Sequence, residues 1–414
     1  MQKKVYQLIK KHKKLLVIGH VWPQPNATAA GEHLVHLMRF FNDLKYQLLF
    51  VSAAQPPENY TILQELSIDS TSVEINDDGF NDILKDFNPN IVLFDRFMVE
   101  EQFSWRVKKV CPEAIRVLDT EDLHFLRKQR KEEISKRKSD FLSDNAKREL
   151  ACMYRCDLNL MISLKEIDLL TTTYNFPKNL LHYVPLLSEK VNLKATPGFE
   201  PRSDFVFVGN FLHEPNWHAA QILKREIWPK LFKKLPKAKL HIYGAYATDK
   251  NYQLHSEKER FLVHGYVENI NDILQKNRVM IAPLFFGAGQ KGKLLKAMQN
   301  GLPSVTTSIG AEAMSFDQDW PGIVVDETDK IIDACVNLYS DKVLWKKTQN
   351  NITELISKNF SYQKHFKTFQ NRIGKLESSI STQRQNNIVG EILWHQSMRS
   401  TEFMSRWIME KNKN

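Results

Sequence analysis

The stretch APLFFGAGQKGKLLKAMQNGLPSVTTSIGAEAM, residues 282–314, decides the fold. An apolar run leads into a loop of glycines and lysines, an amphipathic helix pattern ends near Gly301, and the β-branched run PSVTT follows. Apolar runs of this kind suit strands that are buried on both faces of a parallel sheet. The order strand, loop, helix, strand therefore predicts a βαβ unit of a doubly wound α/β sheet.

The same alternation of short apolar runs and amphipathic stretches continues over most of the chain. Apolar runs lie at residues 15–19, 47–52, 91–95, 115–119 and 158–163 in the first half, and at 204–209, 239–244, 261–265, 278–284, 303–307 and 322–326 in the second. Residues 188–203, which contain two prolines and a glycine, are typical of a linker. We therefore expect two Rossmann-like, doubly wound domains, residues 1–190 and 200–380, that face each other across a cleft.

Length and composition agree with this division and exclude several other classes of protein. A chain of 414 residues with 42% hydrophobic and 26% charged residues is typical of a globular protein of two domains. The four scattered cysteines predict neither a disulfide framework nor a zinc site. No run approaches the ~18 apolar residues of a membrane helix, and the apolar run of residues 15–18 is too short for a signal peptide. We expect a cytoplasmic protein.

The glycine loop has the residues needed to hold an anion. Six of the 15 glycines lie between Gly287 and Gly322, and Lys291 and Lys293 lie within the loop. Glycines let backbone N–H groups approach an anion, the start of the next helix adds partial positive charge, and the lysines supply point charges. The pattern is neither a Walker A loop nor a dinucleotide-binding G-x-G-x-x-G after the first strand. A phosphate site and a tight structural turn both fit these residues.

Three segments of the second half, taken together, resemble a known family. They are FVGNFLHEPN (207–216), VHGYVENINDILQKNRVMIAPLFFGAGQKGK (263–293) and LLKAMQNGLPSVTTSIGAEAM (294–314). In order and spacing they resemble the donor domain of family-4 glycosyltransferases of the bacterial group 1 type. The first half is similar through segments such as WPQPNATAAG (22–31). The resemblance implies a GT-B fold and a retaining enzyme that uses nucleotide sugars. It also implies that residues 386–414 form a C-terminal helix that returns to the N-terminal domain.

The resemblance assigns site roles to residues that match the family's motifs, with the acceptor on residues 1–190 and the donor on residues 200–380. Lys291 matches a basic residue on the donor diphosphate, where it would neutralise the charge that grows on the departing nucleotide. His124 matches a histidine near the transferred sugar, to which it would hydrogen-bond. We expect both residues to be catalytic. The other implied donor-binding residues are Gly31, Gly209, Asn210, Gly289, Gly292 and Glu312.

The segment DTED places Asp119, Glu121 and Asp122 just before His124. A pair of carboxylates would suit a glycoside hydrolase. The alternative, which we favour, is an Asp at the end of a strand followed by an acidic pair at the start of a helix. No D-x-D motif stands at a strand end, so the sequence implies no metal, and the nucleotide sugar is a co-substrate rather than a cofactor.

Two positions depart from the family pattern. Phe285 stands where relatives often carry Arg, and Lys296 stands where many relatives have the Glu that binds the donor ribose. A carboxylate accepts hydrogen bonds from two ribose hydroxyls, whereas an ammonium group only donates. The leading interpretation is a hexosyl-type glycosyltransferase of glycan biosynthesis that acts on a glycan, lipid-linked or other hydroxyl acceptor. The alternative is a catalytically degenerate protein of the same fold that binds sugar nucleotides or glycans.

The formal charge of +10 is concentrated in the half that the resemblance assigns to the acceptor. Six lysines lie in residues 1–14, and nine basic residues lie in residues 127–149. No recognisable nucleic-acid-binding module is present, so nucleic acid is not an expected partner. We expect a peripheral contact with an anionic membrane surface, on its inner face, where a lipid-linked or surface glycan acceptor would be presented. A solvated helix face is the alternative for residues 127–149.

Overall fold

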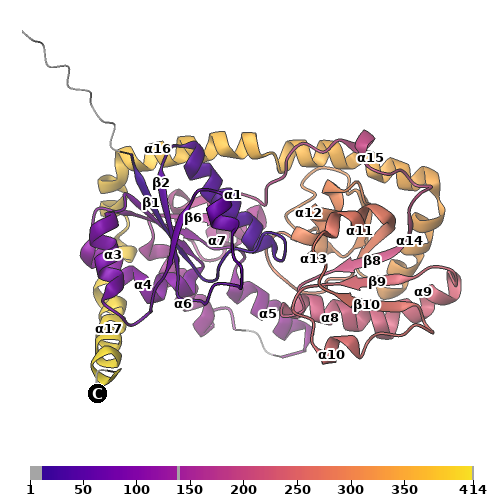
Figure 1. Cartoon of the computed structure of the whole chain (residues 1–414), viewed down its shortest axis with the longest axis horizontal. Coiled ribbons are helices and arrows are strands. Elements are labelled where there is room, and N and C mark those ends of the chain that lie inside the picture. Colours follow the sequence, from indigo (N-terminus) through magenta and orange to yellow (C-terminus); the bar gives the residue numbers. More distant parts are fainter. Residues whose placement is uncertain (1–11, 138–139, 413–414) are drawn as a thin grey trace, which may run out of the picture.

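The computed structural model describes residues 12–137 and 140–412. Two parallel sheets lie one after the other along the long axis of the molecule, and helices cover both faces of each sheet (Figure 1). The first sheet has seven strands in the order β3-β2-β1-β4-β5-β6-β7, and the second has six in the order β10-β9-β8-β11-β12-β13. Both orders reverse direction beside the first strand of the domain, which is the doubly wound arrangement. The predicted fold class is confirmed.

The first domain is built from residues that surround the seven-stranded sheet. Its strands are β1 (Lys14–Gly19), β2 (Gln47–Ser52), β3 (Asp69–Ser72), β4 (Ile91–Asp95), β5 (Ile115–Asp119), β6 (Leu158–Met161) and β7 (Leu181–Tyr183). Its helices are α1 (Ala29–Asp43), α2 (Ile62–Glu65), α3 (Gly79–Phe87), α4 (Phe97–Val110), α5 (His124–Ile134), α6 (Asp144–Arg155) and α7 (Leu164–Thr172).

The second domain surrounds the six-stranded sheet. Its strands are β8 (Ser203–Val208), β9 (Leu240–Tyr243), β10 (Phe261–Gly265), β11 (Asn277–Ala282), β12 (Ser304–Thr306) and β13 (Gly322–Val324). Its helices are α8 (Glu214–Ile222), a π-helical turn (Leu223–Ile227), α9 (Trp228–Lys234), α10 (Asp249–Tyr252), α11 (Ile270–Lys276), α12 (Gly292–Gln299), α13 (Ser308–Ala311), α14 (Thr328–Ser340) and α15 (Lys342–Asn359). The last two helices of the chain are α16 (Tyr362–Asn386) and α17 (Ile388–Asn412).

Strand β1 shows why continuous apolar runs form these sheets. Leu15 and Val17 pack into the core on one face of the first sheet, whereas Leu16 and Ile18 pack into the core on the other face. Because successive strand residues point to opposite faces, a strand with a helix layer on each side must be apolar at every position. The run LLVIG meets that requirement, and the four apolar side chains are fully buried.

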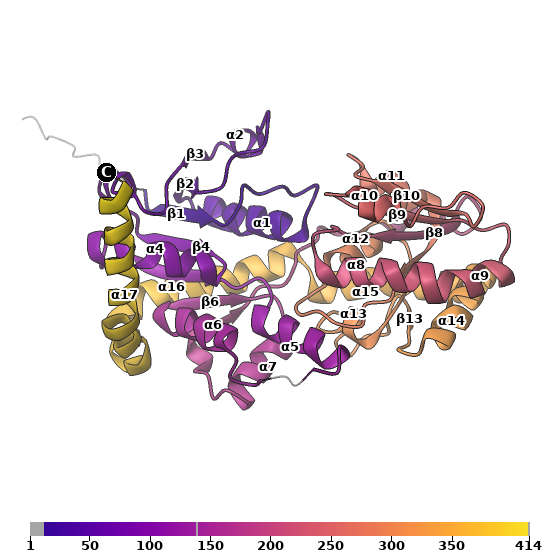
Figure 2. The ribbon, with the colours of Figure 1, turned by 90° about the horizontal axis from the view of Figure 1, so that it is seen from below.

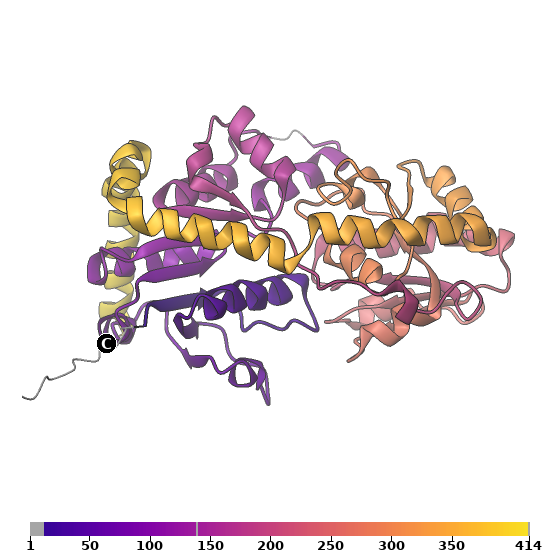
Figure 3. The same ribbon diagram turned by 90° about the horizontal axis from the view of Figure 1, so that it is seen from above.

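The C-terminal helices connect the two domains. Trp345 and Ile352 of α15 belong to the core of the second domain, whereas Phe369 and Ile373 of α16 belong to the core of the first. The chain therefore crosses between Asn359 and Tyr362, and α15 and α16 together run along the whole molecule (Figure 3). The crossing lies earlier in the chain than the segment 386–414 for which the sequence predicts this return. The domain boundaries themselves stay a prediction.

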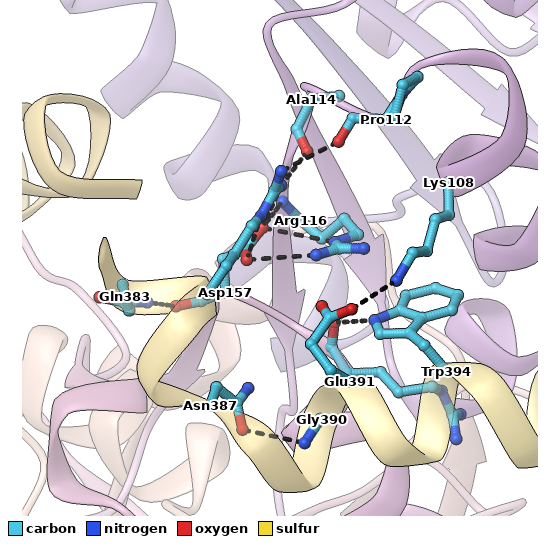
Figure 4. Close-up of polar contacts among 12 residues, drawn as sticks. Lys108, Pro112, Ala114, Arg116, Asp157, Gln383, Asn387, Gly390, Glu391 and Trp394 are labelled. Atoms are coloured by element: carbon cyan, nitrogen blue, oxygen red, sulfur yellow. Dashed lines mark hydrogen bonds and ion pairs between the residues drawn. The ribbon is translucent and has the colours of Figure 1, made fainter. Parts of the chain in front are cut away.

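Helix α17 continues from α16 and lies against α4 and α6 of the first domain, which confirms the predicted return (Figure 4). Arg384, at the end of α16, donates hydrogen bonds to both carboxylate oxygens of Asp157 at 2.9 and 2.8 Å. The indole Nε1 of Trp394 donates to the carbonyl of Arg155 at 3.1 Å, and Lys108 pairs with Glu391 at 3.2 Å. These contacts fix the first turns of α17 to the domain surface.

Across the described ranges, 12–137 and 140–412, no helix is both long enough and apolar enough to cross a lipid bilayer. All four cysteines are buried free thiols.

Candidate active site

The carboxyl ends of the strands in both domains border the region where the domains meet. Helices α1 and α5 of the first domain lie at the border with the second domain (Figure 2). In doubly wound folds, loops at the carboxyl ends of strands form the ligand sites. The glycine loop after β11 and the segment after β5 both lie in this region, since Gly289 packs against Asp122.

Two glycines of the loop are required by close contact with the first domain. A Cβ on Gly289, whose φ is +61°, would lie 2.8 Å from Cβ of Asp122, and a Cβ on Gly292 would lie 2.2 Å from Cβ of Ala29. Neither contact is compatible with a side chain. The loop therefore follows the surface of the first domain, and α12 begins at this contact.

Lys291 is buried and Lys293 is partly buried in the second domain beside this loop. The ammonium of Lys291 donates to the carbonyls of Ala288 and Gly289 at 3.0 and 2.6 Å, and that of Lys293 donates to the side-chain oxygen of Asn216. Burial lowers the pKa of Lys291 to about 8 and that of Lys293 to about 7, and in Lys293 the neighbouring Lys291 adds to the effect. An anion bound here would stabilise both ammonium groups.

The turn after β8 reaches the same place through Asn216. The Nδ2 of Asn216 donates to the carbonyl of Asn210 at 2.9 Å, while its oxygen accepts from Lys293. A Cβ on Gly209 would lie 2.8 Å from Cγ of Asn216, so the glycine allows this approach. The structure thus brings Gly209 and Asn210 next to the lysine loop. Asn216 lies in the motif FVGNFLHEPN, but the sequence assigns it no role.

Two side chains of the first domain contact the donor-side loops. Arg130 of α5 forms a double ion pair with Glu312 at 2.7 and 2.9 Å, and also donates to the carbonyl of Gly287 at 2.8 Å. The amide of Gly289 donates to the carboxylate of Glu166 at 2.6 Å. Burial, together with the charge of Asp122, raises the pKa of Glu166 to about 8. Sequence reasoning missed both Arg130 and Glu166, because neither residue is close in sequence to its partner.

His124 is the first residue of α5, and Glu149 fixes it. The amides of His124 and Phe125 donate to the two carboxylate oxygens of Glu149 at 3.1 and 3.0 Å, which caps the helix. The His124 ring contacts Phe97 edge to face, and its Nε2 lies 3.7 Å from Asp122. Burial lowers the pKa of His124 to about 4, so the imidazole is neutral at pH 7 and acts as a hydrogen-bonding group.

Gly31 lies in the first turn of α1. Its amide donates to the hydroxyl of Thr28 at 3.0 Å, which forms the N-terminal cap of the helix. A Cβ on Gly31 would lie 2.6 Å from the backbone nitrogen of Gln24, so the loop before α1 requires a glycine there. The implied contact of this turn with the diphosphate stays a prediction.

The two positions that depart from the family lie on different sides of the loop. Lys296 of α12 faces α1, with its Nζ 3.6 Å from a carboxylate oxygen of Glu32. Phe285 is partly buried against the core of the second domain. An ion pair between α1 and α12 thus occupies the position where the resemblance implies a ribose-binding carboxylate.

The carboxylates at the end of β5 and after it do not form one group: Asp122 has a basic partner, whereas Asp119 and Glu121 lie close to Asp95. Asp122 pairs with Arg127 at 2.5 Å, and α5 starts only at His124, so the predicted acidic pair precedes the helix rather than lying in its first turn. Within the part of the chain that the structure describes, the one group of side chains with the spacing of metal ligands is Asp95, Asp119 and Glu121.

The second domain matches a known family. The family described as "Glycosyl transferases group 1" matches residues 202–341, which include β8 to β13 and the glycine loop. No curated protein matches the chain significantly. The family predicted from the sequence is therefore confirmed for this part of the chain.

Solved structures of similar fold cover nearly the whole chain. A sucrose-phosphate synthase from Thermosynechococcus elongatus has a TM-score of 0.70 at 11% identity, covering 89% of this chain and 100% of that one. HepE from Anabaena, solved with UDP-glucose, has a TM-score of 0.66 at 12% identity, with 89% and 100% covered. The lipopolysaccharide outer core galactosyltransferase WaaB has a TM-score of 0.57 at 15% identity, with 87% and 99% covered. At these identities the likeness shows the GT-B fold.

Proposed function

We propose that this GT-B protein, whose residues 202–341 match the group 1 glycosyltransferases, transfers a hexosyl residue from a nucleotide sugar to a hydroxyl acceptor with retention. The observation that carries the proposal is the pair of Lys291, which is buried, and Lys293, which is partly buried, beside the glycine loop and the Gly209 turn. Two neighbouring ammonium groups whose pKa is lowered by burial favour the binding of an anion at this loop. A nucleoside diphosphate supplies that charge.

In this proposal each group has a defined task. Lys291 stabilises the negative charge that develops on the departing diphosphate, because it is already held in place by two carbonyls and needs little reorganisation. Neutral His124 hydrogen-bonds to a hydroxyl of the transferred sugar. Contacts between the domains, such as Arg130 with Glu312, hold the closed form in which water is excluded from the donor.

A nucleotide-binding protein without transferase activity is the second candidate. The ion pair of Lys296 with Glu32 favours it, since this pair occupies a position where many relatives have a ribose-binding carboxylate. A protein of this kind binds the diphosphate through the lysine loop but leaves the donor intact.

For the acceptor, we propose a glycan or a lipid-linked molecule that is presented at an anionic membrane surface. WaaB, one of the proteins of similar fold, is a lipopolysaccharide outer core galactosyltransferase. In the basic segment 127–149, however, five basic residues already form ion pairs with described carboxylates: Arg127, Arg130, Lys131, Lys147 and Arg148. Residues 1–11 of the basic stretch 1–14 lie outside the described residues. Flotation with anionic vesicles at low salt, against neutral vesicles, tests this contact, and equal binding to both would contradict it.

A thermal-shift panel of nucleotide sugars tests the donor site. The matching donor raises the melting temperature, because it binds the folded state and not the unfolded chain. The Lys293→Ala variant should lose most of this shift, whereas Lys258→Ala, at a lysine outside the site, should keep it. A panel in which no nucleotide or nucleotide sugar shifts the wild-type melting temperature would contradict both candidate functions.

A further inference from the structure

The carboxyl ends of β4 and β5 carry a carboxylate cluster that the proposed reaction does not use. Asp95 and Asp119 are the last residues of these parallel strands and are paired in register, and Glu121 follows two residues later. One carboxylate oxygen from each lies within 4.8 Å of those from the other two, and all three residues are buried. Like charges directly opposite each other on neighbouring strands are destabilising unless a positive group lies between them.

The protein groups around the cluster satisfy only part of it. Asp95 accepts a hydrogen bond from the amide of His20 at 2.9 Å and faces the Nε of Arg96 at 3.6 Å. By contrast, Oδ2 of Asp119 and Oε1 of Glu121 are buried with no hydrogen-bond partner among the described residues. Among the described residues, the Arg96 guanidinium and the His33 ring are therefore the basic groups that face these three carboxylates. A buried carboxylate oxygen without a partner destabilises the folded state, because the ion loses its hydration and gains no contact in exchange.

A buried histidine points to a ligand at the same place. His33 of α1 is 1% exposed, and neither of its ring nitrogens has a hydrogen-bond partner among the described residues. Its Nε2 lies 3.6 Å from Oδ1 of Asp119, which is too long for a hydrogen bond but within reach of the cluster. In metal sites an imidazole either ligates the ion or donates its N–H to a ligating carboxylate.

We propose that Asp95, Asp119 and Glu121 bind one divalent cation of the Mg²⁺ or Mn²⁺ class. Three carboxylate oxygens favour a hard cation, and oxygens within 4.8 Å of one another are close enough for small side-chain shifts to bring them to bonds of about 2.1 Å. His33 supports Asp119 or completes the ligand set. The cation neutralises the ends of β4 and β5 and fixes the acceptor side of the cleft.

This site is separate from the donor loop, where lysines supply the charge. The sequence implies no metal because no single segment carries a D-x-D motif. The structure instead assembles the ligands from two strands whose terminal aspartates are 24 positions apart. The inference does not depend on the proposed transfer reaction.

Manganese binding to the whole chain, in the absence of nucleotide, tests the proposal. The protein is stripped with EDTA, desalted and titrated with Mn²⁺, and the free ion is followed by its electron paramagnetic resonance signal. We expect one Mn²⁺ per chain, competition by Mg²⁺, and a rise of several °C in melting temperature at about 1 mM Mn²⁺. Absence of binding at about 1 mM would overturn the proposal.

Isosteric variants assign the ligands. Glu121→Gln and Asp95→Asn should each weaken Mn²⁺ binding at least about 10-fold and lose the Mn²⁺-dependent rise in melting temperature. Glu74→Gln, at an exposed residue of the same domain, is the matched control and should bind as wild type does. Wild-type Mn²⁺ binding in both cluster variants would overturn the site. If one variant does not fold, Mn²⁺ binding to the other variant and the wild-type stoichiometry still test whether the cluster binds the cation.

Discussion

Burial of two ammonium groups in one loop is unfavourable unless an anion offsets it. Lys291 and Lys293 are in this situation, with carbonyl and amide oxygens as their hydrogen-bond acceptors. The glycine and lysine pattern left an anion site and a tight structural turn equally open, and the family resemblance favoured the anion site, which stays a prediction. It did not predict the link through Asn216, because that contact joins residues that are 77 positions apart.

The first prediction concerns Lys291. Lys291→Ala should lower turnover at least ~10-fold, which corresponds to a loss of about 1.4 kcal/mol of charge stabilisation in the transition state. Turnover is measured as release of nucleoside diphosphate from the donor that the thermal-shift panel identifies. Lys230→Ala, at an exposed lysine of the same domain, is the control. Wild-type turnover in the Lys291→Ala variant would contradict the assignment.

A second prediction concerns the pH dependence of nucleotide binding. The lysines lose their protons near pH 8 and pH 7 in the free protein, because burial lowers both pKa values. A diphosphate binds the ammonium forms, so its affinity should fall as pH rises from 7 to 9, by up to about 10-fold per pH unit for each group above its pKa. Calorimetric titration with UDP at several pH values measures this fall.

The contrasting variant is Lys293→Met, which removes the group of lower pKa. Its pH dependence should be shallower between pH 7 and 8 than that of the wild type. An affinity for UDP that stays constant or rises from pH 7 to 9 would mean that the lysines do not face the phosphates.

At the scale of elements, the strands were the easiest to predict and the C-terminal helices the hardest. A strand such as β4, IVLFD, is buried at every residue, so its apolar run is unambiguous. Helix α16 has an apolar stripe, but a stripe does not say which of two domains it faces. The structure shows that Phe369 and Leu376 belong to the first domain, so the crossing occurs before α16 and not before α17.

The third prediction concerns the anchor of α17. Trp394 is 6% exposed and packs with Trp105 and Met398, so Trp394→Ala should destabilise the first domain by about 3 kcal/mol or more. Trp407 of the same helix is 59% exposed, and Trp407→Ala should change stability by no more than about 0.5 kcal/mol. Urea unfolding followed by circular dichroism measures both. Equal effects of the two substitutions would contradict the described position of α17.

At the scale of the whole molecule, the two-domain α/β fold followed from the alternation of buried strands and helices along the chain. The contacts between the domains could not be predicted from that alternation. Arg130 and Glu312 are 182 positions apart, and Glu166 and Gly289 are 123 apart, so only the folded chain brings them together. The same holds for the strand-end carboxylates, whose register comes from the pairing of β4 with β5.

These contacts between the domains lead to a fourth prediction. Arg130→Gln removes the double ion pair with Glu312, which bridges the two domains. We expect weaker binding of the donor and a larger share of donor hydrolysis relative to transfer, because the closed form that excludes water is less favoured. Comparison of sugar transfer with free sugar release measures this ratio. An unchanged ratio would mean that the ion pair does not contribute to closure.

The most direct test of the central proposal is the release of nucleoside diphosphate from a panel of nucleotide sugars, with and without glycan or lipid-linked acceptors. We predict that one donor that raises the melting temperature is also consumed, that an acceptor accelerates its consumption, and that Lys291→Ala slows it at least ~10-fold. A donor that binds and stabilises the wild-type protein but is never consumed, with any acceptor, would contradict the transferase and leave the nucleotide-binding alternative.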